Sequence, residues 1–454
     1  MSENVLNLSQ HVCNLWAAKF AKILCSAVFL SGRDFEEALQ NSVLGHYFLK
    51  GYSREVFPVL ECNENERSVT ISFNNSLPRT AKYYGDQGSI TYPLDSKQIF
   101  YEPKKVDSNL PDPNRQDWPM GDVLDNEETL SKIDNNKLQK AVKTVFSDRE
   151  AYTTAFIAVH KGQIIAEKYD LGMGKDAQRE SWSMGKSITA TLIGVLIERG
   201  YFDLYDPAPV PLWNTNDDDP RSKIRIADLL RMSSGLKFSG ATDPPTTWVN
   251  EFPDHEYVYS GSIDVFEFSI NRPLEYPPNT VGRYRNCDPL TLGYIIKKIA
   301  YESGEDYLSW PQRNLFTRIG IRKQVLETDP YGNFIMTGFD YGTPRNWARL
   351  GLLYQQKGVW MDKRILPEDF VNFVSSPAPA WETPEYGGQF WVNGTGRWSL
   401  PEEAFFMAGV GGQWVIIDPE HELVIVRMGH RRGGKAGEIT LNKALPILID
   451  AIKS

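Results

Sequence analysis

The chain has 454 residues, of which 41% are hydrophobic and 24% are charged, and its formal net charge is −9 at pH 7. This composition is typical of a globular protein that is long enough for two domains or one large one. The negative net charge, without any run rich in Lys and Arg, argues against a nucleic-acid partner. The four cysteines are too scattered for a zinc knuckle or a disulfide framework, so we expect no metal or other cofactor. One Cys25–Cys62 bridge stays open.

The first long apolar stretch runs from Leu15 to Leu30 and is interrupted by Lys19 and Lys22. A membrane-spanning helix needs about 20 nearly uncharged residues. A secretory signal has a basic start followed by an unbroken apolar core. The spacing instead predicts an amphipathic helix that packs on the rest of the protein. We therefore expect a cytoplasmic protein without a membrane partner, while export through a degenerate N-terminal signal stays open.

Residues 1–136 form a first region, an N-terminal α/β extension in which we find no readable chemistry. After the helical stretch, residues 67–73 alternate with period two and predict a strand, with short partners at 81–84 and 89–92. Residues 102–129 are rich in Pro, Asp and Asn and predict an irregular connector. Two roles stay open for this extension: it covers the mouth of an active site, or it mediates a homodimer.

Residues 137–454 form the second region, which begins and ends with strands and helices around a mainly helical lobe at about 205–345. The predicted strands are 154–160, 163–169, 413–417 and 423–428. The predicted helices are Ser183 to about Gly200, 226–230, 290–296, one opened by Thr343-Pro344, and 441–452, with loops at 206–220 and 252–262. This order predicts an α+β fold, an antiparallel sheet flanked by helices.

A Ser-x-x-Lys tetrad, Ser183-Met184-Gly185-Lys186, stands at the start of a strong helical pattern. Residues three apart share a helix face, so the hydroxyl of Ser183 lies beside the amine of Lys186. A serine nucleophile needs such a neighbouring base, and a helix N-terminus adds free N–H donors. A second copy, Ser234 to Lys237, contains a glycine typical of a helix end, so we interpret it as a structural turn.

Two further segments could supply a second acid/base group and a second oxyanion donor to work with the tetrad. In Tyr284-Arg285-Asn286, a phenol of lowered pKa can take the serine proton and later protonate the leaving group, while the amide of Asn286 holds a substrate carbonyl and the lysine. The segment from Gly409 to Gln413 enters a strand, and its glycines allow close backbone approach to a ligand. There Val410, with Gly411 beside it, offers a second oxyanion N–H to pair with that of Ser183.

Together these motifs resemble the serine-reactive β-lactamase and penicillin-binding-protein superfamily, on the branch shared by class C β-lactamases, family VIII carboxylesterases and 6-aminohexanoate-dimer hydrolases. The resemblance runs from about residue 140 to the end. It rests on five segments in the family's order: 182–187, 226–236, 284–286, 341–349 and 409–413. It implies a Ser183 nucleophile, Lys186 and Tyr284 as the acid/base pair, and an acyl-enzyme intermediate.

Two departures narrow the expected substrate. Where β-lactamases and D-Ala peptidases have Lys-Thr-Gly or a close variant, this chain has Met407-Ala408-Gly409, with neither cation nor hydroxyl to hold a substrate carboxylate. Tyr284 is followed by Arg285, where many relatives have a small residue. We therefore expect a serine hydrolase acting on a small ester or linear amide. A β-lactamase or D-Ala-D-Ala peptidase and a non-catalytic binding protein stay open as alternatives. Five tryptophans are candidates to line the pocket: Trp182, Trp248, Trp381, Trp391 and Trp414.

Overall fold

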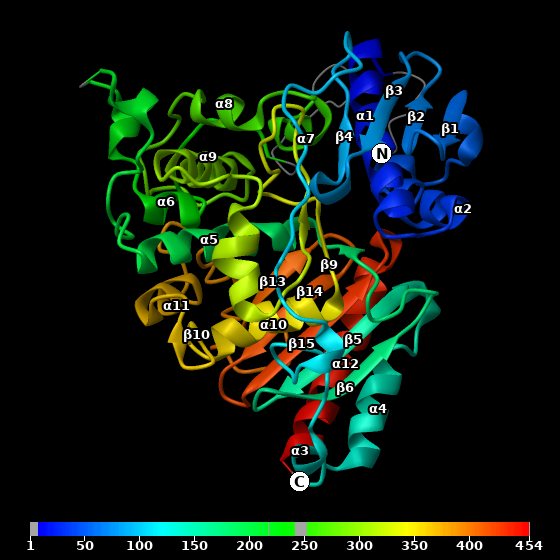
Figure 1. Cartoon of the computed structure of the whole chain (residues 1–454), viewed down its shortest axis with the longest axis vertical. Coiled ribbons are helices and arrows are strands. Elements are labelled where there is room, and N and C mark those ends of the chain that lie inside the picture. The colour runs from blue at the N-terminus through cyan, green and yellow to red at the C-terminus, as the bar shows by residue number, and fades with distance from the viewer. Residues whose placement is uncertain (1–7, 217, 241–251, 454) are drawn as a thin grey trace.

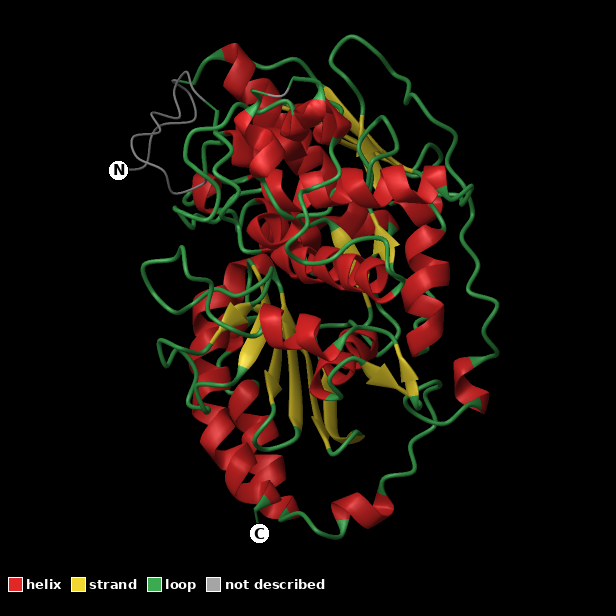
Figure 2. Ribbon diagram, turned by 90° about the vertical axis from the view of Figure 1, so that its left-hand side faces the viewer, coloured by secondary structure: helices red, strands yellow, loops and turns green. Residues whose placement is uncertain are grey.

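A computed structural model describes residues 8–216, 218–240 and 252–453. Trp248, one of the five tryptophans expected to line a pocket, lies outside these described residues. The part of the N-terminal extension up to residue 92 and the helical lobe lie side by side above the main sheet, and the C-terminal end lies at the opposite end of the long axis (Figure 1). Helices cover both faces of this sheet (Figure 2).

The main sheet has six antiparallel strands in the order β12-β13-β14-β15-β5-β6. Their bounds are β5 Thr153–His160, β6 Gln163–Tyr169, β12 Trp391–Val392, β13 Phe405–Gly409, β14 Gln413–Asp418 and β15 Leu423–Gly429. On one face, Ile416 and Ile425 pack under the helices α4 Asn135–Val145 and α12 Gly434–Ile452. On the other face, their neighbours Val415 and Val424 face α10 Pro344–Gln355. The α+β prediction is therefore confirmed.

The helical lobe contains α6 Ile226–Leu230, α7 Asp254–Ser260, α8 Val265–Ile270 and α9 Cys287–Glu302, with α5 Gly185–Glu198 between the lobe and the sheet. The prediction of a loop at 252–262 is wrong, because α7 lies within it. The pattern did not show this helix, since its seven residues bury the polar His255 and Glu256.

The second Ser-x-x-Lys copy, Ser234 to Lys237, is a turn, as predicted. The Ser234 hydroxyl donates to Asp288 at 2.6 Å and Lys237 is exposed.

A small sheet, in the order β7-β9-β8, joins the lobe to the main sheet through β7 Arg179–Glu180, β8 Val325–Leu326 and β9 Asp340–Gly342. Four further elements between residues 127 and 374 are short: α3 Glu127–Leu130, β10 Val359–Trp360, β11 Lys363–Arg364 and α11 Glu368–Val374.

The last helix, α12, starts at Gly434, earlier than the predicted start at residue 441. Its first turns carry glycines, which disfavour helix in a sequence pattern. A side chain at one of them, Gly437, would overlap the guanidinium of Arg427.

Up to residue 92, the N-terminal extension contains α1 Gln10–Phe29, α2 Phe35–Ala38 and a four-stranded antiparallel sheet that packs on α1. Its strands are β1 Val59–Asn63, β2 Ser68–Ser72, β3 Arg79–Tyr83 and β4 Ser89–Thr91. The sequence pattern predicted β2, β3 and β4, but it did not predict β1, which lies at the edge of the sheet. The four cysteines are free thiols, so no Cys25–Cys62 bridge is present.

The helix α1 is packed against the protein, as expected, but it is buried almost all round and so is not amphipathic. Among the described residues it is the one helix with the length and hydropathy of a membrane span, and 89% of its apolar window is buried inside the protein. Lys19 and Lys22 lie in this buried helix, and each is paired with a carboxylate from the second region.

Candidate active site

Ser183 lies in a single 3-10 turn, Trp182–Met184, which leads directly into α5. The preceding residue, Trp182, has φ +51°, a left-handed conformation that is strained for a bulky residue. The surrounding structure holds it there: its ring centroid lies 5.3 Å from that of Phe339, and the Arg431 guanidinium lies 4.6 Å from it. The half-buried Ser183 side chain lies at the cleft described below, at the N-terminal end of α5.

Asp340, a buried carboxyl beside this turn, belongs to none of the sequence motifs. It accepts a hydrogen bond from the Ser181 hydroxyl, and its second oxygen has no hydrogen-bond partner among the described residues. A side chain on Gly185 would overlap that oxygen, which explains the glycine inside the tetrad. Burial raises the pKa of Asp340 to about 7, against the opposing effects of the Ser181 hydrogen bond and the Lys186 charge.

Lys186 is buried, and its Nζ lies 3.4 Å from Ser183 Oγ. It also donates to the carbonyl oxygen of Thr337 at 2.8 Å and lies 4.8 Å from the centroid of the Tyr284 ring. Burial lowers the pKa of Lys186 to about 7, while the carboxyl of Asp340 acts in the opposite direction. At neutral pH a large fraction of this amine is therefore unprotonated and able to accept a proton.

Tyr284 lines the cleft and stacks on Trp391, with ring centroids 5.5 Å apart. The expectation of a lowered phenol pKa is wrong. Withdrawal from water raises the pKa of Tyr284 above its ordinary value, and a hydrogen bond with Ser183 only partly opposes this. At neutral pH Tyr284 is therefore a neutral phenol, and the base beside Ser183 is Lys186.

Asn286 does not lie where the motif predicted. It is fully buried at the start of α9, and its Nδ2 donates to the His255 carbonyl oxygen at 2.9 Å. It is not among the residues that line the cleft, and Thr337 holds Lys186 in its place. Arg285 also points into the lobe, where it donates to the carbonyl oxygens of Leu236 and Arg283. This departure from the family pattern therefore leaves the cleft unchanged.

The glycine segment forms the turn between β13 and β14. Gly409 ends β13 against the backbone carbonyl of Ser181, where any side chain would overlap. Gly411 and Gly412 have φ of +89° and +78°, which a glycine adopts without strain. Val410 is 47% exposed, and both Val410 and Gly411 line the cleft with Ser183. The structure thus brings the hairpin and the nucleophile turn together, as predicted.

The cleft has a volume of about 390 Å³. Its walls are partly aromatic, from Tyr284, Trp391 and Trp414. At its edge Arg397 and Glu438 form a two-bonded ion pair, with distances of 2.8 and 3.0 Å. Of the tryptophans expected to line a pocket, Trp391 and Trp414 do so, whereas Trp182 and Trp381 pack against other side chains.

Comparison with known proteins identifies the class. The family described as Beta-lactamase matches residues 138–445, so the chain belongs to the β-lactamase family. A 6-aminohexanoate-dimer hydrolase of Paenarthrobacter ureafaciens is 23% identical over 302 residues, which cover 62% of this chain and 73% of that protein.

Two solved structures share the fold. One is a Bacillus anthracis protein with the provisional name 6-aminohexanoate-dimer hydrolase. It has a TM-score of 0.55 and 21% identity, over 67% of this chain and 81% of that one. The other is EstCE1, described as a hydrolase with promiscuous acyltransferase activity. It has a TM-score of 0.53 and 15% identity, over 72% of this chain and 99% of that one.

Proposed function

We propose that this protein is a serine hydrolase that cleaves an ester or a linear amide through an acyl-enzyme on Ser183. The observation that carries the proposal is the buried amine of Lys186, which lies 3.4 Å from Ser183 Oγ and has a pKa of about 7. A general base works best when its pKa is near the working pH. The same site contains a neutral phenol and a glycine hairpin that can meet a substrate carbonyl.

In the proposed reaction, Lys186 accepts the Ser183 proton as Oγ attacks the substrate carbonyl carbon. The N–H groups of Ser183 and Val410 stabilise the negative oxygen of the tetrahedral intermediate. The C–O or C–N bond then breaks, and Tyr284 gives its proton to the departing oxygen or nitrogen while it regains one from Lys186. A water molecule attacks the acyl-Ser183 ester with the same proton route in reverse, which releases the acid and restores the serine.

The walls of the cleft support the substrate class. Met407 is buried in β13 and Ala408 brings only a methyl group to the cleft, so this strand offers no cation for the carboxylate of a penicillin or a D-Ala terminus. The aromatic rings of Trp391 and Trp414 favour an apolar acyl or amine chain. The relatives named for cleavage of a short linear amide and for hydrolase and acyltransferase activity support the same class.

The test is turnover of a panel of p-nitrophenyl esters, short linear amides and a penicillin by the parent protein, Ser183→Ala and Ser234→Ala. We expect the parent to cleave an ester or an amide, Ser183→Ala to lose at least about 10³-fold in kcat/KM, and Ser234→Ala to keep its activity. Full activity in Ser183→Ala would refute the proposal. Turnover of the penicillin alone would favour a β-lactamase, and failure to react with any substrate or with a fluorophosphonate would favour a binding protein.

A further inference from the structure

Two lysines of α1 are buried in a way that the proposed reaction does not explain. The side chains of Lys19 and Lys22 are 3% and 2% exposed. Each forms an ion pair with a buried carboxylate of the second region, Lys19 with Glu256 and Lys22 with Glu327. A buried ion pair adds little net stability, because desolvation offsets the attraction between the charges. Two such pairs across one junction therefore call for another role.

The pair of Lys22 and Glu327 leads to the amine of Lys186. Glu327 is held by three groups of the extension: Lys22 Nζ at 2.9 Å, the Ser26 hydroxyl at 2.6 Å and the Ser89 N–H at 2.8 Å. All three come from α1 or β4. Gly88, just before β4, lies so close to the Glu327 side chain that a Cβ there would overlap it. The carboxylate is thus enclosed by the extension.

The backbone of Glu327 in turn holds a loop of the active site. Its N–H donates to the Phe339 carbonyl at 3.0 Å, and its carbonyl accepts from the Ile335 N–H at 2.8 Å. Between these two bonds the chain presents the carbonyl oxygen of Thr337, which accepts from Lys186 Nζ at 2.8 Å. A continuous set of contacts therefore runs from Lys22 through Glu327 and this loop to Lys186.

The pair of Lys19 and Glu256 leads to Tyr284. Lys19 donates to Glu256, which lies on α7 next to His255. The carbonyl of His255 accepts from Asn286, and its ring centroid lies 6.0 Å from that of Tyr284. Burial, aided by the charge of Lys186, lowers the pKa of His255 to about 3, so this ring is neutral at pH 7.

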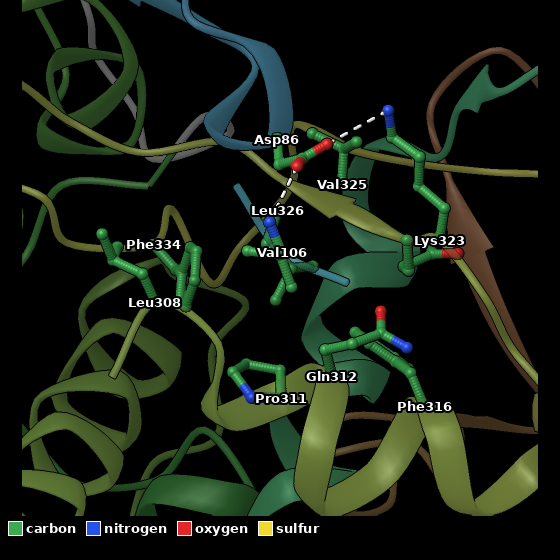
Figure 3. Close-up of a pocket in the computed structure, with 11 residues that line it drawn as sticks. Asp86, Val106, Leu308, Pro311, Gln312, Phe316, Lys323, Val325, Leu326 and Phe334 are labelled. Atoms are coloured by element: carbon green, nitrogen blue, oxygen red, sulfur yellow. Dashed lines mark hydrogen bonds and ion pairs between the residues drawn. The ribbon is translucent and has the colours of Figure 1, made fainter. Parts of the chain in front are cut away.

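The junction between the extension and the second region is tightly packed. Figure 3 shows Asp86 and Val106 of the extension against the segment that leads to β8. Asp86 pairs with Lys323 at 3.1 Å and accepts from the Val106 N–H at 2.9 Å. The cavity between them is only about 20 Å³, roughly the room that one water needs. The extension is therefore a closely fitted part of the molecule on the segment that also carries Glu327.

We propose that the N-terminal extension is a positioning element of the active site, in which Lys22 acts through Glu327 on the loop that orients Lys186, and Lys19 acts through Glu256 on the surroundings of Tyr284. This inference rests on the proposed function. Lys19, Lys22, Glu256 and Glu327 are positioning residues, since none of them lines the catalytic cleft. The extension thus contributes to the chemistry of the active site.

The test compares Lys22→Met and the charge-balanced Lys22→Met/Glu327→Gln with the parent and with Lys82→Met. The last variant removes an exposed ion pair of the same extension, Lys82–Glu66 at 2.6 Å. Lys22→Met leaves a buried carboxylate unpaired, so its melting temperature falls, and the double variant recovers most of this loss. We expect the double variant to keep a KM within about twofold of the parent but to lose tenfold or more in kcat. We also expect the acid limb of its pH profile to shift, while Lys82→Met behaves as the parent.

A double variant with the kcat and pH profile of the parent would overturn the inference, whatever its melting temperature. A second readout does not need turnover: the pH titration of the Lys186 side chain by ¹³C NMR in lysine-labelled protein, assigned with Lys186→Met. We expect the midpoint for Lys186 to move in the double variant, and an unchanged midpoint would count against the inference. If the parent itself fails to turn over any ester or amide, the proposed function falls, and the titration still decides whether the extension positions Lys186.

Discussion

The buried amine of Lys186 lies 3.4 Å from the hydroxyl of Ser183, which faces the cleft. Both residues come from one short segment, yet the segment alone does not produce the geometry. The carbonyl of Thr337 fixes the amine, and Asp340 holds the turn before the serine through Ser181. Contacts more than 150 residues away in the chain therefore turn a common tetrad into a nucleophile and its base.

The activity should depend on the protonation of Lys186. With a pKa of about 7, the base is lost as the pH falls below 7, so kcat/KM should fall about tenfold per pH unit on the acid side. A pH–rate profile of ester hydrolysis by the parent checks this. An acid limb centred near the ordinary carboxylate range, with no inflection near 7, would contradict the assignment of the base.

The same pKa predicts an unusual stability for Lys186→Met. Because folding lowers the pKa of this amine from 10.5 to about 7, the unfolded chain binds more protons between those values. The contribution of Lys186 to the free energy of unfolding therefore rises with pH across that window. Removal of the amine should abolish activity and leave the melting temperature at pH 7 unchanged or higher. Thermal unfolding of both proteins measures this, and marked destabilisation of Lys186→Met at pH 7 would argue against a lowered pKa of this amine.

Tyr284→Phe should slow cleavage according to the leaving group. Without the phenol proton, kcat should fall by about 10²- to 10⁴-fold for an alkyl ester or an amide, and less for a p-nitrophenyl ester, whose leaving group needs no proton. Tyr331→Phe, in the other Tyr-x-Asn copy, is the matched control because Tyr331 does not line the cleft and packs on Phe100. Equal losses for both kinds of leaving group would exclude Tyr284 as the acid.

Gly185→Ala should displace the turn that carries Ser183. The added methyl group would overlap the buried carboxyl of Asp340, and overpacking of this kind costs about 1–3 kcal/mol of stability. Activity should fall further than stability, because the displaced turn carries Ser183. Gly174→Ala is the control, since a Cβ at Gly174 meets nothing within 4 Å. Activity measured well below the melting temperature separates the two effects, and parent-level kcat in Gly185→Ala would contradict the packing argument.

The edge of the cleft should control the preference for substrate charge. Glu438 occupies two donors of Arg397, so Glu438→Gln should free this guanidinium for a substrate carboxylate. We expect kcat/KM for an ester that carries a carboxylate to rise several-fold relative to a neutral ester of the same length, and Arg397→Gln to have the opposite effect. An identical ratio in the parent and both variants would show that the ion pair does not contact substrate.

The parts of the fold that depend on local pattern could be predicted from the sequence. The alternation in 413–417 and 423–428 predicted the central hairpin, and Thr343-Pro344 predicted the start of α10, where the Thr343 side chain caps the helix. The helix α7 and the burial of α1 could not be predicted in this way, since both depend on pairing polar groups such as Lys19 and Glu256 across the chain.

In the candidate site, too, residues in local motifs could be predicted from the sequence, whereas roles that depend on contacts across the chain could not. Ser183, Lys186 and Tyr284 could be found because their spacing is a motif, and Val410 and Gly411 because glycines mark a turn. Asp340 could not be found, since its role depends on contact with Ser181 and Gly185 in three dimensions. Asn286 was predicted to hold Lys186 because the motif does not show which way a side chain points, and in this fold it bonds to His255.

Capture of the acyl-enzyme tests the central claim most directly. The parent, incubated with a p-nitrophenyl ester and quenched in acid, should gain the mass of one acyl group, and peptide mapping should place that group on Ser183. Lys186→Met and Ser183→Ala should show no adduct under the same conditions. An adduct on another residue, or hydrolysis at the parent rate in Ser183→Ala, would contradict the account.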